Sequence, residues 1–265
     1  MKTKKEKVRF ILLLICLILY FIVVETGWFN TPINNEGNNT PSSEQQIVEN
    51  KEDTALTLVE PTSSASLNNI PKFTNQPIVI INGNNPLFTD EEKQITYAFE
   101  SYSDLDELGR CGVAYANICP ELMPEDAREG IGSVKPSGWN NVKYTGIVDG
   151  GYLYNRCHLI GFQLAGENAN KLNLITGTRY LNVVGMLPYE NLVADYVKST
   201  GNHVLYRVTP IYNGDELVCR GLTMEAYSVE DNGAGVKFYV YCYNNQPYIT
   251  INYMDGSSSL TREVG

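Results

Sequence analysis

The sequence predicts a single α+β domain with an antiparallel sheet, covering about residues 70–265. Four late segments, each of strand length and rich in aromatic and β-branched residues, predict that sheet: 203–212, 217–227, 236–243 and 248–253. Asn213-Gly214-Asp215 between the first two is a hairpin turn signal. Residues 188–199 carry apolar side chains at three- and four-residue spacing and stop before Gly201, which is typical of an amphipathic helix.

Earlier elements are shorter. Residues 77–84 read as a buried strand ending in a turn, and 110–116 as another strand. Thr89-Asp90-Glu91-Glu92 can cap a helix running to about residue 97, with acids at the positive end of its dipole. Residues 152–158 predict a strand that ends at His158.

The N-terminal 29 residues predict a membrane anchor or a signal segment. Five basic side chains within residues 1–9 precede an unbroken apolar run over 10–24. No small residues follow at a cleavage position, and Trp28 and Phe29 are typical of interfacial anchors, which favours an uncleaved membrane helix. The basic end stays inside, so we expect an extracellular C-terminal domain; secretion after cleavage is the alternative.

Residues 30–69 predict a disordered linker, because Asn, Ser, Thr, Pro and Glu dominate and few aromatic residues occur.

The domain after the linker has an uneven charge. The whole chain carries −10, which argues against a general polyanion binder. Residues 130–210, however, hold seven basic and four acidic side chains, a local charge of +3.

Five cysteines lie beyond the apolar run. Cys111 with Cys119, and Cys219 with Cys242, are hypothetical disulfide pairs, which would leave Cys157 over. Cys157 precedes His158 on the same predicted strand, so the two side chains face opposite sides. This favours a buried packing role for Cys157 over a nucleophilic one.

The stretch Asn155-Arg156-Cys157-His158 carries the strongest functional signal. A neutral histidine can take a proton from an attacking water near pH 7. A hard cation held by amide and carboxylate oxygens can neutralise the charge that develops on a phosphodiester. Asn173, Asn182 and Glu190 follow within 33 positions and supply such oxygens.

This stretch resembles the DNA/RNA non-specific endonuclease family, whose signature is Asp-Arg-Gly-His followed by a helix with a metal-binding Asn. The resemblance spans about residues 130–255 and is strongest over 155–191. Asn replaces Asp here, as in one branch of the family, and Cys157 replaces Gly. The resemblance implies a ββα-metal nuclease fold with a central antiparallel sheet.

The resemblance also implies roles. His158 matches the general base, Asn182 the asparagine that binds Mg²⁺, and Glu190 the glutamate that holds a metal-bound water. Asn173 matches an asparagine that orients the histidine region or the phosphate. Arg156 matches the motif arginine, a site residue that is structural or lies near the phosphate. Mn²⁺ is a possible substitute for Mg²⁺, and no small-molecule cofactor is expected.

Arg179, and with it Lys171, is a substrate-binding candidate on charge alone, since a guanidinium can grip a phosphate with two hydrogen bonds. Plainer interpretations stay open: both asparagines suit turns or caps, Glu190 suits a helix start, and Arg179 a solvated surface.

We therefore predict an extracellular, metal-dependent endonuclease that cuts DNA with little sequence preference, with RNA as an open second substrate. One rival is a nuclease-like module that binds DNA at the cell surface without turnover. Another is a thiol-reactive surface protein, against which the lack of a Cys-x-x-Cys pair counts.

Overall fold

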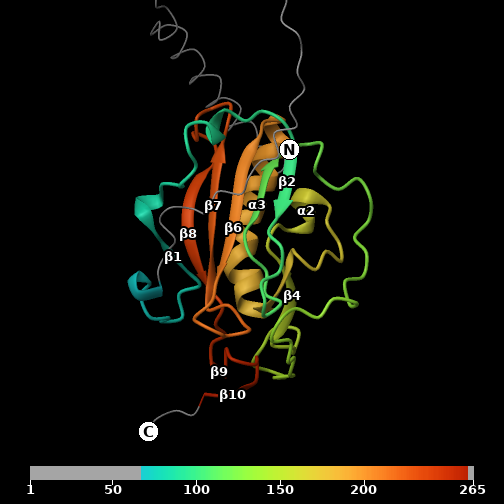
Figure 1. The fold of residues 1–265 in the computed structure, drawn as a ribbon, viewed down its shortest axis with the longest axis vertical. Coiled ribbons are helices and arrows are strands. Elements are labelled where there is room, and N and C mark those ends of the chain that lie inside the picture. The colour runs from blue at the N-terminus through green and yellow to red at the C-terminus, as the bar shows by residue number, and fades with distance from the viewer. Residues whose placement is uncertain (1–66, 262–265) are drawn as a thin grey trace, which may run out of the picture. The chain divides into compact units, whose positions relative to one another are not determined.

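The computed structural model describes residues 67–261. Its main element is a six-stranded antiparallel sheet in the order β1-β8-β7-β6-β3-β2 (Figure 1). The strands are β1 (Ile78–Ile80), β2 (Phe99–Tyr102), β3 (Ala114–Ile118), β6 (Val204–Ile211), β7 (Gly221–Ser228) and β8 (Lys237–Tyr243). The predicted α+β class with a central antiparallel sheet is confirmed.

Two smaller sheets complete the strands. β4 (Tyr154–His158) pairs with β5 (Leu174–Thr178), and β9 (Ile249–Ile251) pairs with β10 (Ser258–Leu260). The alternation of residues 248–253 predicts a strand of the central sheet, and this prediction is wrong. Instead the segment forms a hairpin with the last described strand, next to the cluster of Leu153, Tyr154 and Ile249.

The predicted helix at 188–199 is confirmed as α3 (Leu187–Thr200), which crosses one face of the central sheet (Figure 1). Its apolar side buries Val193, Ala194 and Val197 in the main core. It ends at Gly201, whose φ of 74° is a left-handed conformation that glycine adopts without a Cβ clash. α2 (Phe162–Ala165) is a single turn, and the π-helix η4 (Leu181–Met186) leads directly into α3.

The remaining helical pieces are short 3-10 turns: η1 (Leu67–Asn69), η2 (Asn82–Asn84) and η3 (Glu92–Gln94). The last corrects the helix predicted over 89–97. Thr89 and Glu92 exchange the reciprocal bonds of a capping box, but the chain is already extended at Ile95, with φ −75° and ψ 118°. The second Glu92 oxygen binds buried Arg207, so tertiary contacts replace the helix.

The two predicted disulfides are wrong, because all five cysteines in the described residues are free and buried. β3 separates Cys111 from Cys119, and a five-residue strand extends ~16 Å. Cys242 lies opposite Leu222 and its sulfur contacts Met224, whereas the Cys219 sulfur contacts the Asn244 amide. A regular strand pairing thus keeps each pair of sulfurs apart.

The predicted anchor at 1–29 lies outside the described residues, as does the predicted linker up to residue 66. Across the described range, 67–261, no helix combines the length and the apolar character needed to cross a bilayer.

Candidate active site

The β4–β5 hairpin fixes His158 at one end of a five-pair ladder, opposite Leu174. The imidazole is buried, with 5% of the residue exposed. Its Nε2 lies 2.9 Å from the Asn168 carbonyl oxygen, and its Nδ1 lies 3.4 Å from Arg128 Nη2. Because a carbonyl oxygen only accepts, the proton of the neutral ring belongs on Nε2. Nδ1 keeps its lone pair.

The surroundings of His158 favour this neutral form. Burial lowers the pKa of His158, and the nearby Arg128 guanidinium lowers it further against the opposing effect of the Asn168 carbonyl. Asn168 also accepts a hydrogen bond from the Glu129 backbone through its side chain, so it ties the histidine to the segment that carries Arg128. The imidazole is therefore held as a proton acceptor at neutral pH.

Glu190, in the first turn of α3, brings a buried carboxylate to the same place. Only 8% of the residue is exposed, and burial raises the pKa of Glu190 to about 8. A Cβ at Gly161 would lie 2.8 Å from Glu190 Oε1, so the absence of a side chain at Gly161 makes room for the carboxylate. Within residues 67–261 no hydrogen-bond donor pairs with this carboxylate, although Arg128 lies close enough to lower its pKa.

Asn182 lies one residue into the π-helix η4, eight positions before Glu190. Its Oδ1 accepts a hydrogen bond from the Cys157 thiol at 3.1 Å. π-Helical turns occur often at functional sites, where they shift a side chain out of the α-helical path. His158, Asn182, Glu190 and Arg128 all line one open pocket of about 910 Å³.

Asn173 takes a different position from the other predicted site residues. It is fully buried and clamps the backbone after His158: its Oδ1 accepts from Ile160 N at 2.9 Å, and its Nδ2 donates to Ile160 O at 3.0 Å. It does not line the pocket. Asn173 thus holds the loop between His158 and Gly161 and does not face a substrate.

The predicted basic residues separate into three situations. Arg156 stacks on Trp139 at 4.3 Å and donates to the carbonyls of Val134 and Gly132, so it organises the wall of the pocket. Arg179 lines the pocket but is paired with Asp149 at 2.9 Å. Lys171 lies outside the pocket.

Sequence reasoning missed Arg128, which is 30 positions before His158 and follows an acidic loop. A count of basic residues that begins at residue 130 stops two positions short of it. The nearest available signal was a lone arginine between Asp126 and Glu129. The pocket also contains Asn155, whose buried Oδ1 has no hydrogen-bond partner.

Cys157, at the glycine position of the signature, fits without disturbing the hairpin. β4 and β5 stay paired through Cys157 and Ile175. Gly177 provides the space, since a Cβ there would lie 2.6 Å from the Cys157 Cβ. Burial raises the pKa of the Cys157 thiol far above its usual value, which agrees with a packing residue and not a nucleophile.

A model of the DNA/RNA non-specific endonuclease family matches residues 90–230, which is more than half of the 265 residues and includes every pocket residue discussed above. The chain belongs to this family. Membership identifies it as a nuclease of the hydrolase class and confirms the resemblance seen in Asn155–His158. No curated protein matches the chain.

Solved nuclease structures share the fold. NucA from Streptococcus agalactiae with magnesium bound is 26% identical with a TM-score of 0.59, and the match covers 69% of this chain and 86% of NucA. Metal-free NucA gives a TM-score of 0.62 at the same identity, over 74% of this chain and 92% of NucA. The Sda1 nuclease with a bound zinc ion is 26% identical with a TM-score of 0.60, over 71% and 96%.

Proposed function

We propose that this protein is a divalent-metal-dependent endonuclease that hydrolyses phosphodiester bonds of DNA, with Mg²⁺ as the metal and Mn²⁺ as a substitute. The observation that carries the proposal is the pairing, in one pocket, of a histidine held in its neutral form with a buried carboxylate that has no hydrogen-bond donor among residues 67–261. NucA from S. agalactiae, which is similar to this chain in sequence and fold, has been solved with magnesium bound.

The residues present fit a hard cation. Glu190 is a buried carboxylate with no donor in the described residues, and burying an uncompensated charge is costly. Asn182 lines the same pocket, and its amide oxygen, which accepts from the Cys157 thiol, is a neutral oxygen donor. Oxygen donors with few charges suit Mg²⁺, which keeps several waters. An ion held by these residues would neutralise charge on the phosphate and on the leaving oxygen.

In this mechanism His158 accepts a proton from the attacking water at Nδ1, while the Asn168 carbonyl holds the Nε2 proton and so the ring orientation. The 3.4 Å contact from Arg128 to Nδ1 is long, so a water can take its place as the arginine turns toward a phosphate oxygen. Asn173 keeps the loop after His158 in place through its two bonds to Ile160.

Arg156, Arg179 and Lys171 act outside the chemical step. Arg156 shapes the pocket wall with Trp139, and Arg179 reaches a phosphate only after it leaves the exposed Asp149. Lys171 contributes to the positive charge of the surface that follows a nucleic-acid backbone. Contacts of this type carry no base readout, which agrees with cutting that has little sequence preference.

The test uses the full chain on supercoiled plasmid and on total RNA, with Mg²⁺, Mn²⁺ or EDTA. We expect nicked and linear plasmid with either metal and none with EDTA, and the RNA lane decides whether RNA is a second substrate. Folded protein that shifts DNA in a gel but cuts neither substrate would contradict the proposal and support the DNA-binding module without turnover.

The location of the protein is also proposed from sequence. The basic residues before the apolar run at 10–24 support a single-pass membrane protein with an extracellular nuclease domain. Cell fractionation with N-terminal sequencing tests it. A membrane-bound chain that keeps residues 1–29 agrees with the proposal, and a soluble chain that begins near residue 27 indicates secretion instead.

A further inference from the structure

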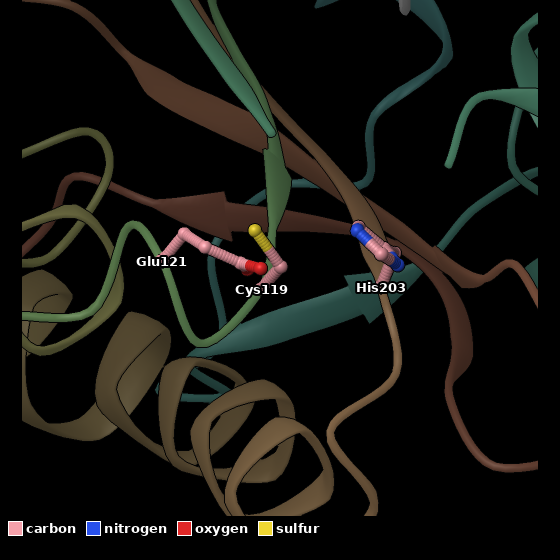
Figure 2. Close-up of side chains that lie close together, drawn as sticks. All are labelled: Cys119, Glu121 and His203. Carbon is pink, nitrogen blue, oxygen red and sulfur yellow. The ribbon is translucent and has the colours of Figure 1, made fainter. Parts of the chain in front are cut away.

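The second histidine of the chain lies away from the nuclease pocket, beside a cysteine and a glutamate. Ile118, the last residue of β3, pairs with Val204, the first of β6. Cys119 and His203 are the next residues along the two strands, so the same register brings them side by side. The turn after β3 adds Glu121, and the three ligand atoms all lie within 4.8 Å of one another (Figure 2).

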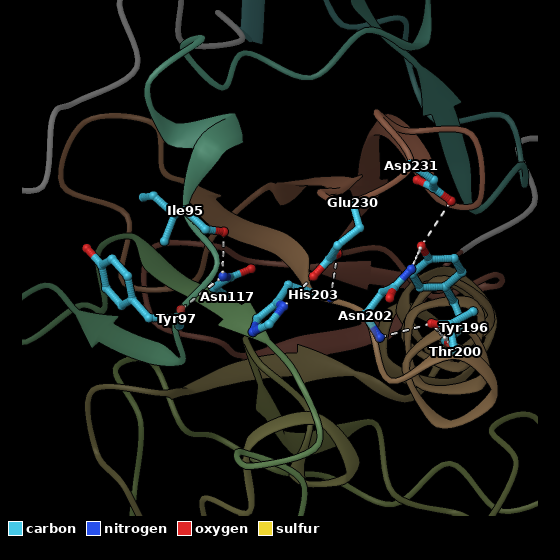
Figure 3. Close-up of polar contacts among 9 residues, drawn as sticks. All are labelled: Ile95, Tyr97, Asn117, Tyr196, Thr200, Asn202, His203, Glu230 and Asp231. Carbon is cyan, nitrogen blue, oxygen red and sulfur yellow. Dashed lines mark hydrogen bonds and ion pairs between the residues drawn. The ribbon is translucent and has the colours of Figure 1, made fainter. Parts of the chain in front are cut away.

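Each of the three groups already has a polar environment suited to a cation. The Glu121 carboxylate and the Cys119 thiol are neighbours within the cluster. His203 Nδ1 lies 2.6 Å from Glu230 Oε1, and the His203 backbone N–H donates to Glu230 Oε2 at 2.9 Å (Figure 3). Glu230 therefore fixes the ring from one side and leaves Nε2 available as a ligand.

This arrangement has the form of a metal site with its outer shell in place. Histidines that bind metal ions nearly always donate their other ring N–H to a carboxylate or a carbonyl. Cys119 is buried and Glu121 is exposed, so the cluster has a thiol set in the protein and a carboxylate open to solvent, by which an ion can enter. None of the three residues lines the nuclease pocket.

We propose that Cys119, Glu121 and His203 form a second metal site, specific for a zinc-like transition metal ion. Thiolate and imidazole ligands favour zinc over magnesium, and three protein ligands leave a fourth position for water. Metal–ligand bonds of ~2.0–2.3 Å place tetrahedral ligands ~3.3–3.8 Å apart, so the cluster must contract by ~1 Å. Glu121 lies in a turn and is exposed, so it can move that distance.

Binding releases the Cys119 thiol proton to the solvent, and the ion takes the place of that proton against Glu121. The site then ties the start of the 119–128 segment to β6. Arg128, at the end of this segment, is the residue that contacts His158. The second ion thus has a structural role, supporting the segment that supplies the nuclease pocket with its arginine.

The test uses Co²⁺ as an optical probe of the full chain, together with equilibrium dialysis against Zn²⁺ and metal analysis, with excess Mg²⁺ present to occupy the oxygen site. We expect a thiolate-to-cobalt charge-transfer band and one Zn²⁺ per chain. Cys119→Ser should abolish both. Cys157→Ser is the matched control, because Cys157 is the thiol beside Asn182, and it should keep both.

Two further variants test the zinc site if Cys119→Ser does not fold. Glu121→Gln changes only an exposed side chain and should weaken Zn²⁺ binding. Glu230→Gln leaves all three ligands in place and should weaken it ~10–100-fold, as loss of an outer-shell partner does. No band in the wild-type protein, a band that survives Cys119→Ser, or unchanged affinity in both Glu121→Gln and Glu230→Gln would overturn the site.

Discussion

The two histidines of this chain have opposite surroundings. His158 is buried between a neutral backbone carbonyl and a cation, Arg128. Burial and the arginine charge both lower the pKa of His158, which makes the imidazole a neutral proton acceptor. His203 lies at a strand end with 18% of its side chain exposed and is bonded to a carboxylate, Glu230. The comparison teaches that the charges around each ring differ: the cation beside His158 favours the neutral ring that the proposed base needs, and the carboxylate on His203 favours the ring orientation that the proposed metal ligand needs.

The same contrast applies to the carboxylates near each histidine. Glu230 is bonded to His203, whereas Glu190 shares a pocket with His158 but has no donor among the described residues. A carboxylate that pairs with a histidine tunes that histidine, and a buried carboxylate left without a pair is suited to an ion.

Among variants that keep His158, the largest effect should come from Glu190→Gln. Removing the charged donor should lower Mg²⁺ affinity by more than the ~10–100-fold that loss of an outer-shell partner costs, and cleavage at limiting Mg²⁺ should fall accordingly. Rates measured over a Mg²⁺ titration check this. Asp195→Asn on the exposed side of α3 is the matched control, since it removes the same charge from the same helix. Equal Mg²⁺ dependence in both variants would contradict the assignment.

Asn173→Ala should destabilise the loop that carries His158. The substitution leaves the Ile160 N–H and carbonyl without their buried partner, at a cost on the order of 2–4 kcal/mol. Urea denaturation measures it. Asn170→Ala, which removes one bond to Leu172 from a half-buried side chain, should cost less. A smaller loss for Asn173→Ala than for Asn170→Ala would show that the clamp is not important.

Arg128→Ala should change the pH dependence of cleavage. The arginine lowers the pKa of His158, so its removal lets that pKa rise toward the usual value. The protonated ring cannot accept a proton, and the acid limb of the kcat/KM profile should therefore move to higher pH. Arg179→Ala, which removes a cation paired with Asp149, should leave the limb in place. An acid limb that does not move in Arg128→Ala would contradict the claim that Arg128 lowers the pKa of His158.

Arg179→Ala should have the smallest effect on stability. Its partner Asp149 has 80% of its side chain exposed, and such surface pairs contribute less than ~1 kcal/mol. Thermal or urea unfolding should barely change, and cleavage should fall only a few-fold and with a weaker dependence on salt. A tenfold or larger loss of cleavage would instead place Arg179 directly on the phosphate.

Local sequence patterns predicted the parts of the site that local structure builds. The period of apolar residues predicts α3, and the strand before His158 follows from its aromatic lead-in. The helix predicted at 188–199 does not include the π-helical turn that carries Asn182, because that turn depends on packing of Leu181 and Met186 in the core.

The parts that sequence did not predict depend on contacts between distant segments. Thr89 and Glu92 form a capping box at the predicted helix start. Asn117, however, donates to the carbonyls of Ile95 and Tyr97 at 3.0 and 2.9 Å and holds the chain extended (Figure 3). Arg128 reaches His158 from a loop with no periodicity. The cysteines pack in the core, where spacing alone carries no information about pairing.

The most direct test of the central claim is chemical rescue of His158→Gly in the full chain. With saturating Mg²⁺ we expect plasmid cleavage to fall ~10²–10⁴-fold, the share that a general base contributes. Added imidazole should restore part of that rate, in proportion to its neutral form, and should leave the wild-type rate unchanged. Cleavage at the wild-type rate by a folded His158→Gly protein without imidazole would contradict the assignment of His158 as the base.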